Sequence, residues 1–122
     1  MTSQSDDRKP RILYVEDEVI VALDVADSLK YDYGFDVAVA HNLRTANVLA
    51  QSQDFDFALL DVNLGNNERS CELGQTLRDR GVTLVFASGY ESKAISELDG
   101  FTVIEKPFLV SDVGAALQAS AA

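Results

Sequence analysis

The stretch FALLDVNLG, residues 57–65, places the carboxylate of Asp61 directly after four apolar residues. An apolar run without polar alternation is typical of a strand that is buried on both faces. A carboxylate at the end of such a strand costs free energy unless a cation or hydrogen-bond donor compensates its charge. The groups that surround Asp61 therefore decide what this segment does.

Similar apolar runs recur along the chain and alternate with segments of helical spacing. Strands are predicted at residues 12–15, 37–40, 57–60, 82–87 and 101–104. Helices are predicted at residues 19–33, 71–80, 92–98 and 111–118, and a further helix is predicted to begin after an N-cap at Asn42. The first of these helices has Ile20, Leu23, Ala26 and Leu29 at helical spacing. Repeated strand–helix units predict an α/β fold with a parallel sheet covered on both faces, and functional sites in such sheets lie beyond the carboxyl ends of the strands.

Length and composition predict one domain, residues 11–122, behind a flexible tail at residues 1–10. The net charge of −10 argues against direct nucleic-acid binding and against anionic membranes. The single cysteine, Cys71, excludes an internal disulfide and fits a reducing compartment. No apolar run approaches the roughly 20 residues of a membrane span, so we expect a cytoplasmic protein.

Polar and charged residues follow the predicted strands. Glu16-Asp17-Glu18 follows the first, Asp61 the third, Ser88 the fourth and Lys106 the fifth. A charged residue after one strand is usually a solvated loop residue, but these residues together would converge on one edge of the sheet. Oxygen ligands favour Mg²⁺ or Mn²⁺, and no Cys/His set for zinc is present. A carboxylate beside a metal, a hydroxyl and a lysine is suited to accepting a phosphoryl group.

These residues, in this order, carry a family resemblance from about Arg11 to Ala119. The acidic pair, the Asp-Val-Asn-Leu segment at Asp61, the hydroxyl of Ser88 and the Lys-Pro-Phe segment at Lys106 together resemble a response-regulator receiver domain. The resemblance implies a flavodoxin-like, doubly wound (βα)5 sandwich with strand order 2-1-3-4-5. In that family the peptide bond at the position of Lys106–Pro107 is often cis.

The resemblance further implies a role for each site residue. Asp61 would be the phosphoacceptor. Asp17 and Glu16 would hold Mg²⁺ together with Asp61 and the backbone carbonyl of Asn63. The Ser88 hydroxyl and the Lys106 ammonium would contact phosphoryl oxygens, which are catalytic roles in the domain's own phosphorylation.

Residues 86–92, FASGYES, resemble the Phe-Ala-Thr-Gly-Tyr signature of a receiver subgroup often paired with HWE and HisKA2 histidine kinases. Ser88 keeps the hydroxyl of the signature threonine. Val103 stands where many receivers carry a switching aromatic residue. The short spacing between Ser88 and Lys106 predicts a short or irregular fourth helix. We therefore expect phosphorylation to order or shift residues 89–100 through Ser88.

The predicted function is a stand-alone, phosphorylation-switched signalling module rather than an enzyme acting on other substrates. Its partners would be a histidine kinase or phosphotransfer protein and an unidentified downstream protein, and homodimerisation is left open. One alternative is a phosphatase of the haloacid-dehalogenase kind, but that family needs a second aspartate where Asn63 stands. Another is a flavodoxin-like cofactor binder, which needs a phosphate loop where this chain has Glu16-Asp17-Glu18.

Overall fold

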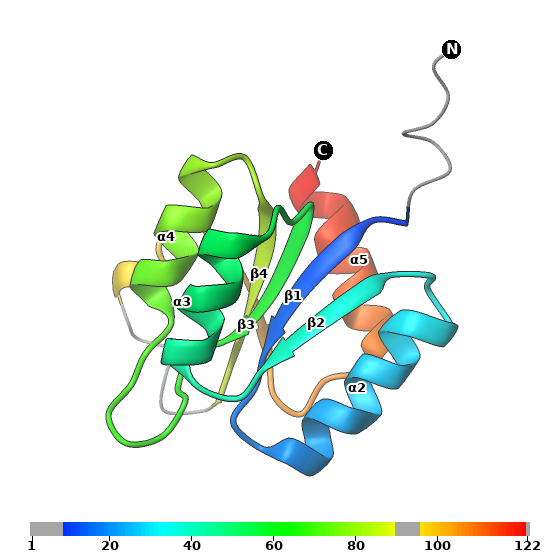
Figure 1. The fold of residues 1–122 in the computed structure, drawn as a ribbon, viewed down its shortest axis with the longest axis horizontal. Helices are drawn as coiled ribbons and strands as arrows, with labels where there is room; N and C mark the ends of the chain where they lie inside the picture. Colours follow the sequence, from blue (N-terminus) through cyan, green and yellow to red (C-terminus); the bar gives the residue numbers. More distant parts are fainter. Residues whose placement is uncertain (1–8, 90–95, 122) are drawn as a thin grey trace.

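One parallel sheet runs through the centre of the computed structural model, which describes residues 9–89 and 96–121 (Figure 1). Its strands are β1 (Arg11–Val15), β2 (Asp36–Ala40), β3 (Phe57–Asp61), β4 (Thr83–Ser88) and β5 (Thr102–Glu105). They are hydrogen-bonded in the order β2-β1-β3-β4-β5, which confirms the predicted topology. The order reverses between β1 and β3, so the edge beyond their carboxyl ends is the expected place for a site.

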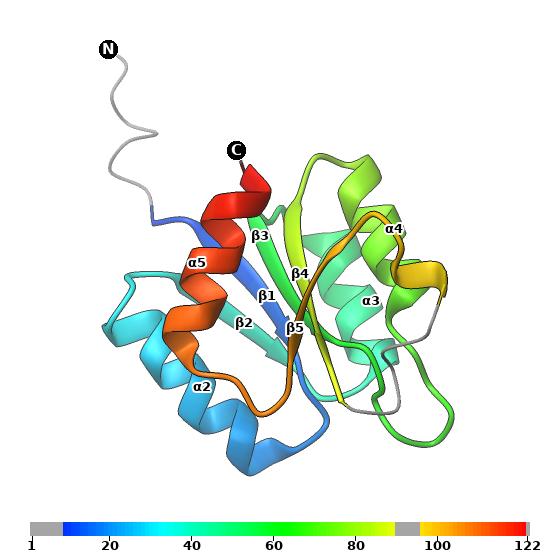
Figure 2. The same cartoon turned by 180° about the vertical axis from the view of Figure 1, so that it is seen from behind.

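Helices cover both faces of the sheet (Figures 1 and 2). The helices are α2 (Val19–Tyr31), α3 (Leu43–Ser52), α4 (Cys71–Asp79) and α5 (Val110–Ala121), with a 3₁₀ helix η2 at Ser96–Leu98. Helices α2 and α5 pack on one face, and α3 and α4 on the other. The fold is therefore the predicted flavodoxin-like sandwich.

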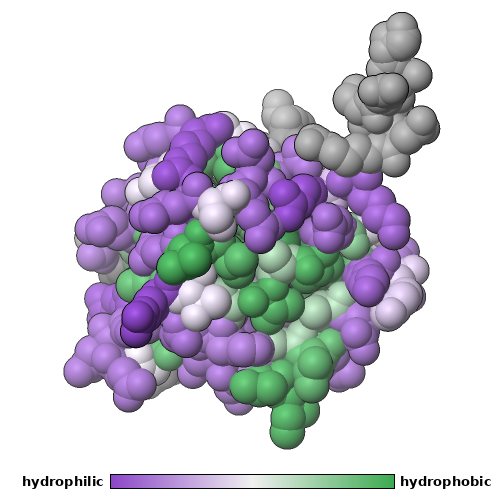
Figure 3. Space-filling view, in the orientation of Figure 1, coloured by the Kyte–Doolittle hydropathy of each residue, from purple (hydrophilic) through white to green (hydrophobic). Residues whose placement is uncertain are grey.

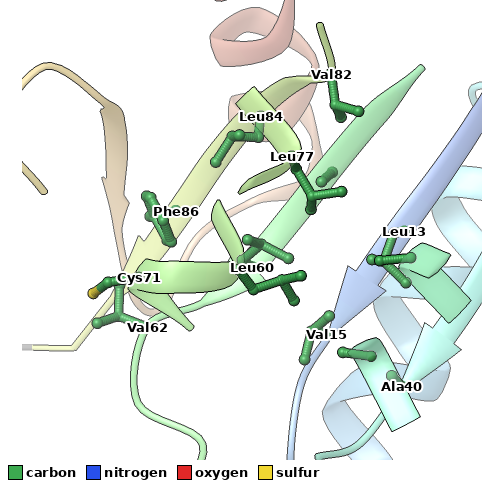
Figure 4. Packing of buried hydrophobic residues seen from close by; sticks show 14 of the residues in the cluster. Leu13, Val15, Ala40, Leu60, Val62, Cys71, Leu77, Val82, Leu84 and Phe86 are labelled. Atoms are coloured by element: carbon green, nitrogen blue, oxygen red, sulfur yellow. The ribbon is translucent and has the colours of Figure 1, made fainter. Parts of the chain in front are cut away.

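The central strands are buried on both faces. Leu13 and Val15 of β1 face α3 and α4, whereas Ile12 and Tyr14 face α2 and α5. Figure 4 shows the first of these layers, where side chains of β3, β4 and α4 pack together. Because β1, β3 and β4 lack a solvent-facing side, their apolar runs do not alternate, as the sequence predicts.

The face that α2 turns to the core differs from the predicted one. Ile20 is 83% exposed and Leu23 62% exposed, while Ala22, Val25 and Leu29 are buried. The first five residues of α2 are all apolar, so their spacing cannot identify one inward side. The helix turns its small Ala22 to the sheet and leaves larger apolar side chains in solvent at its start, visible at the lower edge of Figure 3.

Other local predictions have clear outcomes. Asn42 caps α3, since its Oδ1 accepts a hydrogen bond from the Thr45 N–H at 2.8 Å. The described part of the predicted fourth helix is only the three-residue η2, and residues 90–95 lie outside the described residues. Most of the predicted N-terminal tail, residues 1–8, lies outside them too. In the described chain no helix has both the length and the apolarity needed to cross a membrane.

Candidate functional site

The carboxyl ends of β1, β3, β4 and β5 bring the predicted site residues to one edge of the sheet. Glu16 and Asp17 follow β1, Asp61 and Ser88 end β3 and β4, and Lys106 follows β5. A hollow of about 260 Å³ lies at this edge. The residues that line it are Asp17, Glu18, Asp61, Asn63, Gly65, Gly89 and Lys106.

Three carboxylates meet at the hollow. Glu16, Asp17 and Asp61 each offer an oxygen, and these oxygens lie within 4.8 Å of one another. Glu16 is 1% exposed and Asp61 3% exposed, so water screens their repulsion poorly. Clustered carboxylate oxygens with one open side suit a hard divalent cation such as Mg²⁺.

Lys106 is the cation that faces these acids. Its Nζ lies 2.9 Å from Asp61 Oδ2 and 3.3 Å from Glu16 Oε1, with the exposed Glu18 at 3.9 Å. One ammonium therefore serves two buried carboxylates. A net negative charge remains at the hollow, which favours a cation there.

The pKa values reflect this shortage of positive charge. Burial raises the pKa of Glu16 to about 7, and the neighbouring charge of Asp61 adds to the effect. Burial also raises the pKa of Asp61, although the hydrogen bond from Lys106 opposes the shift. Burial works to lower the pKa of Lys106, but its hydrogen bond to Asp61 and the nearby negative charges outweigh burial and raise it. Metal-free Glu16 therefore holds a proton up to near neutral pH.

The loop after Asp61 folds as a small hairpin beside the hollow. Asn63 forms an antiparallel bridge with Arg69, and the turn residues Asn66 and Asn67 have φ values of 50° and 63°. The Asn63 Oδ1 accepts a hydrogen bond from the Gly65 N–H at 3.2 Å. A side chain at Gly65 would put its Cβ 3.4 Å from Asp17 Oδ2. The hairpin thus forms a close wall of the acidic cluster.

Ser88 is fully buried at the end of β4. Its hydroxyl donates to the carbonyl of the next residue, Gly89, at 2.9 Å, so in this structure the side chain has a backbone partner. The Ser88 carbonyl in turn accepts a hydrogen bond from the Lys106 N–H at 2.9 Å, next to the cis Lys106–Pro107 bond that the resemblance implied. Val103 on the edge strand β5 is 38% exposed.

Ser70 belongs to the site but escaped the sequence analysis. It is fully buried, its hydroxyl donates to the Asp61 carbonyl at 2.7 Å, and its N–H donates to the Val62 carbonyl at 3.0 Å. A serine before a predicted helix looks like an N-cap, yet the Ser70 side chain makes no capping bond. It instead fastens the end of the hairpin to the backbone of Asp61.

Gly74 is a second residue whose role is not evident from the sequence alone. A Cβ at this position would collide with the Phe86 ring, so helix α4 can lie this close to β4 only because residue 74 has no side chain. Phe86 is two residues before Ser88 and packs edge-on against Phe101 at a ring distance of 5.0 Å. The packing of α4 against Phe86, two residues before Ser88, therefore depends on Gly74.

The fold and the site define a class: a flavodoxin-like α/β domain with an acidic cluster and a lysine at the carboxyl edge of its sheet. Residues 12–118 match the response regulator receiver domain family. The chain therefore belongs to this family of two-component signalling domains, which work with histidine kinases or phosphotransfer proteins.

Solved structures agree with this assignment. The solution structure of SdrG from Sphingomonas melonis Fr1 is 29% identical, has a TM-score of 0.78, and covers 100% of both chains. A response regulator from Burkholderia pseudomallei with a phosphorylated aspartic acid, calcium ion and citrate is 29% identical with a TM-score of 0.79, covering 93% of this chain and 69% of that one.

A receiver domain from Methanospirillum hungatei JF-1, 22% identical with a TM-score of 0.77, covers 93% of this chain and 98% of its own. At that identity it supports the fold alone. A search of curated proteins found no match.

Proposed function

We propose that the domain is a phosphorylation-activated switch whose phosphoacceptor is Asp61. The observation that carries the proposal is the 2.9 Å contact between Lys106 Nζ and Asp61 Oδ2 inside a hollow bounded by further carboxylates. A buried aspartate paired with a lysine and open on one side has both a nucleophilic oxygen and a positive charge for incoming phosphoryl oxygens.

The acidic cluster fits a divalent metal cofactor. Glu16, Asp17 and Asp61 would hold Mg²⁺, or Mn²⁺, and the backbone carbonyl of Asn63 on the hairpin would add a ligand. The fit rests on three clustered carboxylates of which Lys106 contacts only Glu16 and Asp61, since a divalent ion would neutralise the charge that Lys106 leaves over. When bound, the ion would supply charge neutralisation for the transferring phosphoryl group.

The residues of the chain would act on the transfer as follows. An Asp61 oxygen attacks the phosphorus of a phosphohistidine, a P–O bond forms, and the P–N bond to the donor histidine breaks. Lys106 offsets charge on one phosphoryl oxygen. The Ser88 hydroxyl would leave the Gly89 carbonyl and donate to a second phosphoryl oxygen. This change of partner would couple residues 89–100 to phosphorylation.

The donor is a histidine kinase or a phosphotransfer protein, and the FASGY signature favours the HWE and HisKA2 kinase classes. At the start of α2, directly after the acidic loop, Val19, Ile20 and Leu23 are more than half exposed. An apolar surface next to the phosphoacceptor suits a partner that must approach Asp61. We place the exchange in the cytoplasm, in keeping with the single free cysteine.

Phosphotransfer from purified kinases tests the proposal. Kinases of the HWE and HisKA2 classes and of other classes would be labelled with radioactive ATP and mixed with this chain and Mg²⁺. We expect label to move to the wild type and to an Asp79→Asn control, which changes an exposed aspartate at the end of α4. Label should not move to Asp61→Asn, and a chelator should prevent its transfer to the wild type. Equal labelling of Asp61→Asn would refute the assignment.

A further inference from the structure

The Tyr14 hydroxyl is buried next to the site and has no use in the mechanism above. Tyr14 lies on β1, is 1% exposed, and packs its ring among apolar side chains that include Leu59 and Val113. Among the described residues no group forms a hydrogen bond with its hydroxyl, which is itself buried. A buried hydroxyl without a partner costs free energy, so its retention requires an explanation.

Glu16 is the polar neighbour that fits this hydroxyl. The Glu16 N–H bonds the Ala40 carbonyl at 3.0 Å and so continues the pairing of β1 by one residue. Side chains two residues apart on an extended strand point to the same face. Burial raises the pKa of Tyr14 far above its ordinary value, and the charges of Glu16 and Asp61 and a hydrogen-bonding contribution from Glu16 raise it further, as expected for a hydroxyl close to Glu16. A tyrosine hydroxyl is protonated at neutral pH and can act as a donor.

In this structure Glu16 has other donors. Its carboxylate receives Lys106 Nζ at 3.3 Å through Oε1 and the Glu18 N–H at 3.3 Å through Oε2. Lys106 is shared with Asp61, which holds it at the shorter distance of 2.9 Å. A phosphoryl group on Asp61 brings further negative oxygens that compete for the same ammonium. Glu16 would then be a buried carboxylate that has lost its charged donor.

We propose that Tyr14 is a positioning residue for Glu16, whose carboxylate accepts the Tyr14 O–H when a phosphoryl group on Asp61 draws Lys106 away. The inference rests on the proposed function of Asp61. Tyr14 thus acts in the phosphorylated state, where its O–H holds the Glu16 carboxylate in a fixed orientation. The free-energy cost of burying this hydroxyl without a partner is therefore present in the unphosphorylated state.

Tyr14→Phe tests this idea because its effects on the two states differ in sign. Removal of an unpartnered hydroxyl should leave the melting temperature of the unliganded protein unchanged or raise it. The same change should weaken binding of beryllofluoride with Mg²⁺, a noncovalent phosphoryl mimic, by about tenfold, since hydrogen bonds to charged groups are among the stronger ones. Tyr31→Phe, at a tyrosine that is 73% exposed, is the matched control and should change neither quantity.

Absorption spectroscopy gives a signature that mere packing would not. The chain has four tyrosines and no tryptophan, so tyrosine dominates its near-ultraviolet spectrum. Binding of the mimic should shift a tyrosine band to the red in the wild type and in Tyr31→Phe, but not in Tyr14→Phe. In a Glu16→Gln background, Tyr14→Phe should change the affinity for the mimic by a smaller factor than it does in the wild-type background.

The outcomes distinguish a failure of this inference from a failure of the proposed function on which it rests. If the wild type binds the mimic and Tyr14→Phe binds it equally well, the role of Tyr14 is overturned while the function of Asp61 stands. If Tyr14→Phe melts at a lower temperature without ligand and shows no selective loss of the mimic, the hydroxyl is structural. If the wild type binds no mimic and accepts no phosphoryl group, the proposed function fails and the inference fails with it.

Discussion

Glu16→Gln should stabilise the metal-free protein at alkaline pH and leave it nearly unchanged at acidic pH. Burial and Asp61 raise the pKa of Glu16 from an ordinary 4.5 to about 7. Between these values the folded state binds a proton that the unfolded state has released. Stability therefore falls as pH rises through this window, because folding then forces a charge into a buried site. Glutamine has the shape of the protonated acid and carries no charge to bury.

The magnitude follows from the two pKa values. Their separation corresponds to about 3 kcal/mol of unfolding free energy. Glu16 is 1% exposed, so solvent screening does not reduce this figure much. We expect Glu16→Gln to gain about 2–3 kcal/mol at about pH 8. At about pH 4 the folded and the unfolded wild type both carry the proton, and the gain should nearly vanish.

Urea unfolding at both pH values, in the presence of a chelator, measures the effect. Glu72→Gln is the matched control, because Glu72 is exposed on α4 and should shift stability by less than about 0.5 kcal/mol at either pH. Addition of Mg²⁺ should stabilise the wild type and reverse the ranking at alkaline pH. A Glu16→Gln variant that is less stable than the wild type at alkaline pH without metal would refute the reasoning.

Three further substitutions have predicted outcomes. Lys106→Met removes the ammonium between two buried carboxylates and should cost about 3 kcal/mol in urea unfolding at about pH 8, with part recovered by Mg²⁺; an unchanged midpoint would contradict the pairing. Ser70→Ala leaves the Asp61 carbonyl without its donor and should cost about 1–2 kcal/mol by the same assay, whereas a neutral result would show that the bond is dispensable. Gly74→Ala should lower stability by about 1–3 kcal/mol in thermal unfolding and move the NMR signals of Phe86, and unshifted signals would argue against close helix packing.

The sequence sufficed for the sheet and for the charged residues at its edge. Apolar runs located all five strands, and carboxyl ends of parallel strands must share one edge, so Asp61 and Lys106 could be placed together without coordinates. The predicted helix face was wrong at Ile20 and Leu23, because the first five residues of α2 are apolar on every side and leave the inward direction to tertiary packing.

Supporting residues were harder to find, because their roles depend on contacts distant in sequence. Ser70 is beside Asp61 only because residues 62–70 form a hairpin, which a loop composition does not reveal. Tyr14 has the apolar surroundings of any core strand residue, and only coordinates show that its hydroxyl is unpartnered and near Glu16. Gly74 looks like a weak helix residue until the Phe86 ring is placed against it.

Intact-mass spectrometry after incubation with acetyl phosphate and Mg²⁺ tests the central claim most directly. We predict that the wild type and Asp79→Asn gain the mass of one phosphoryl group, that a chelator prevents the gain, and that Asp61→Asn gains nothing. An adduct that persists in Asp61→Asn, or no adduct on the wild type, would contradict the assignment of Asp61 as the phosphoacceptor.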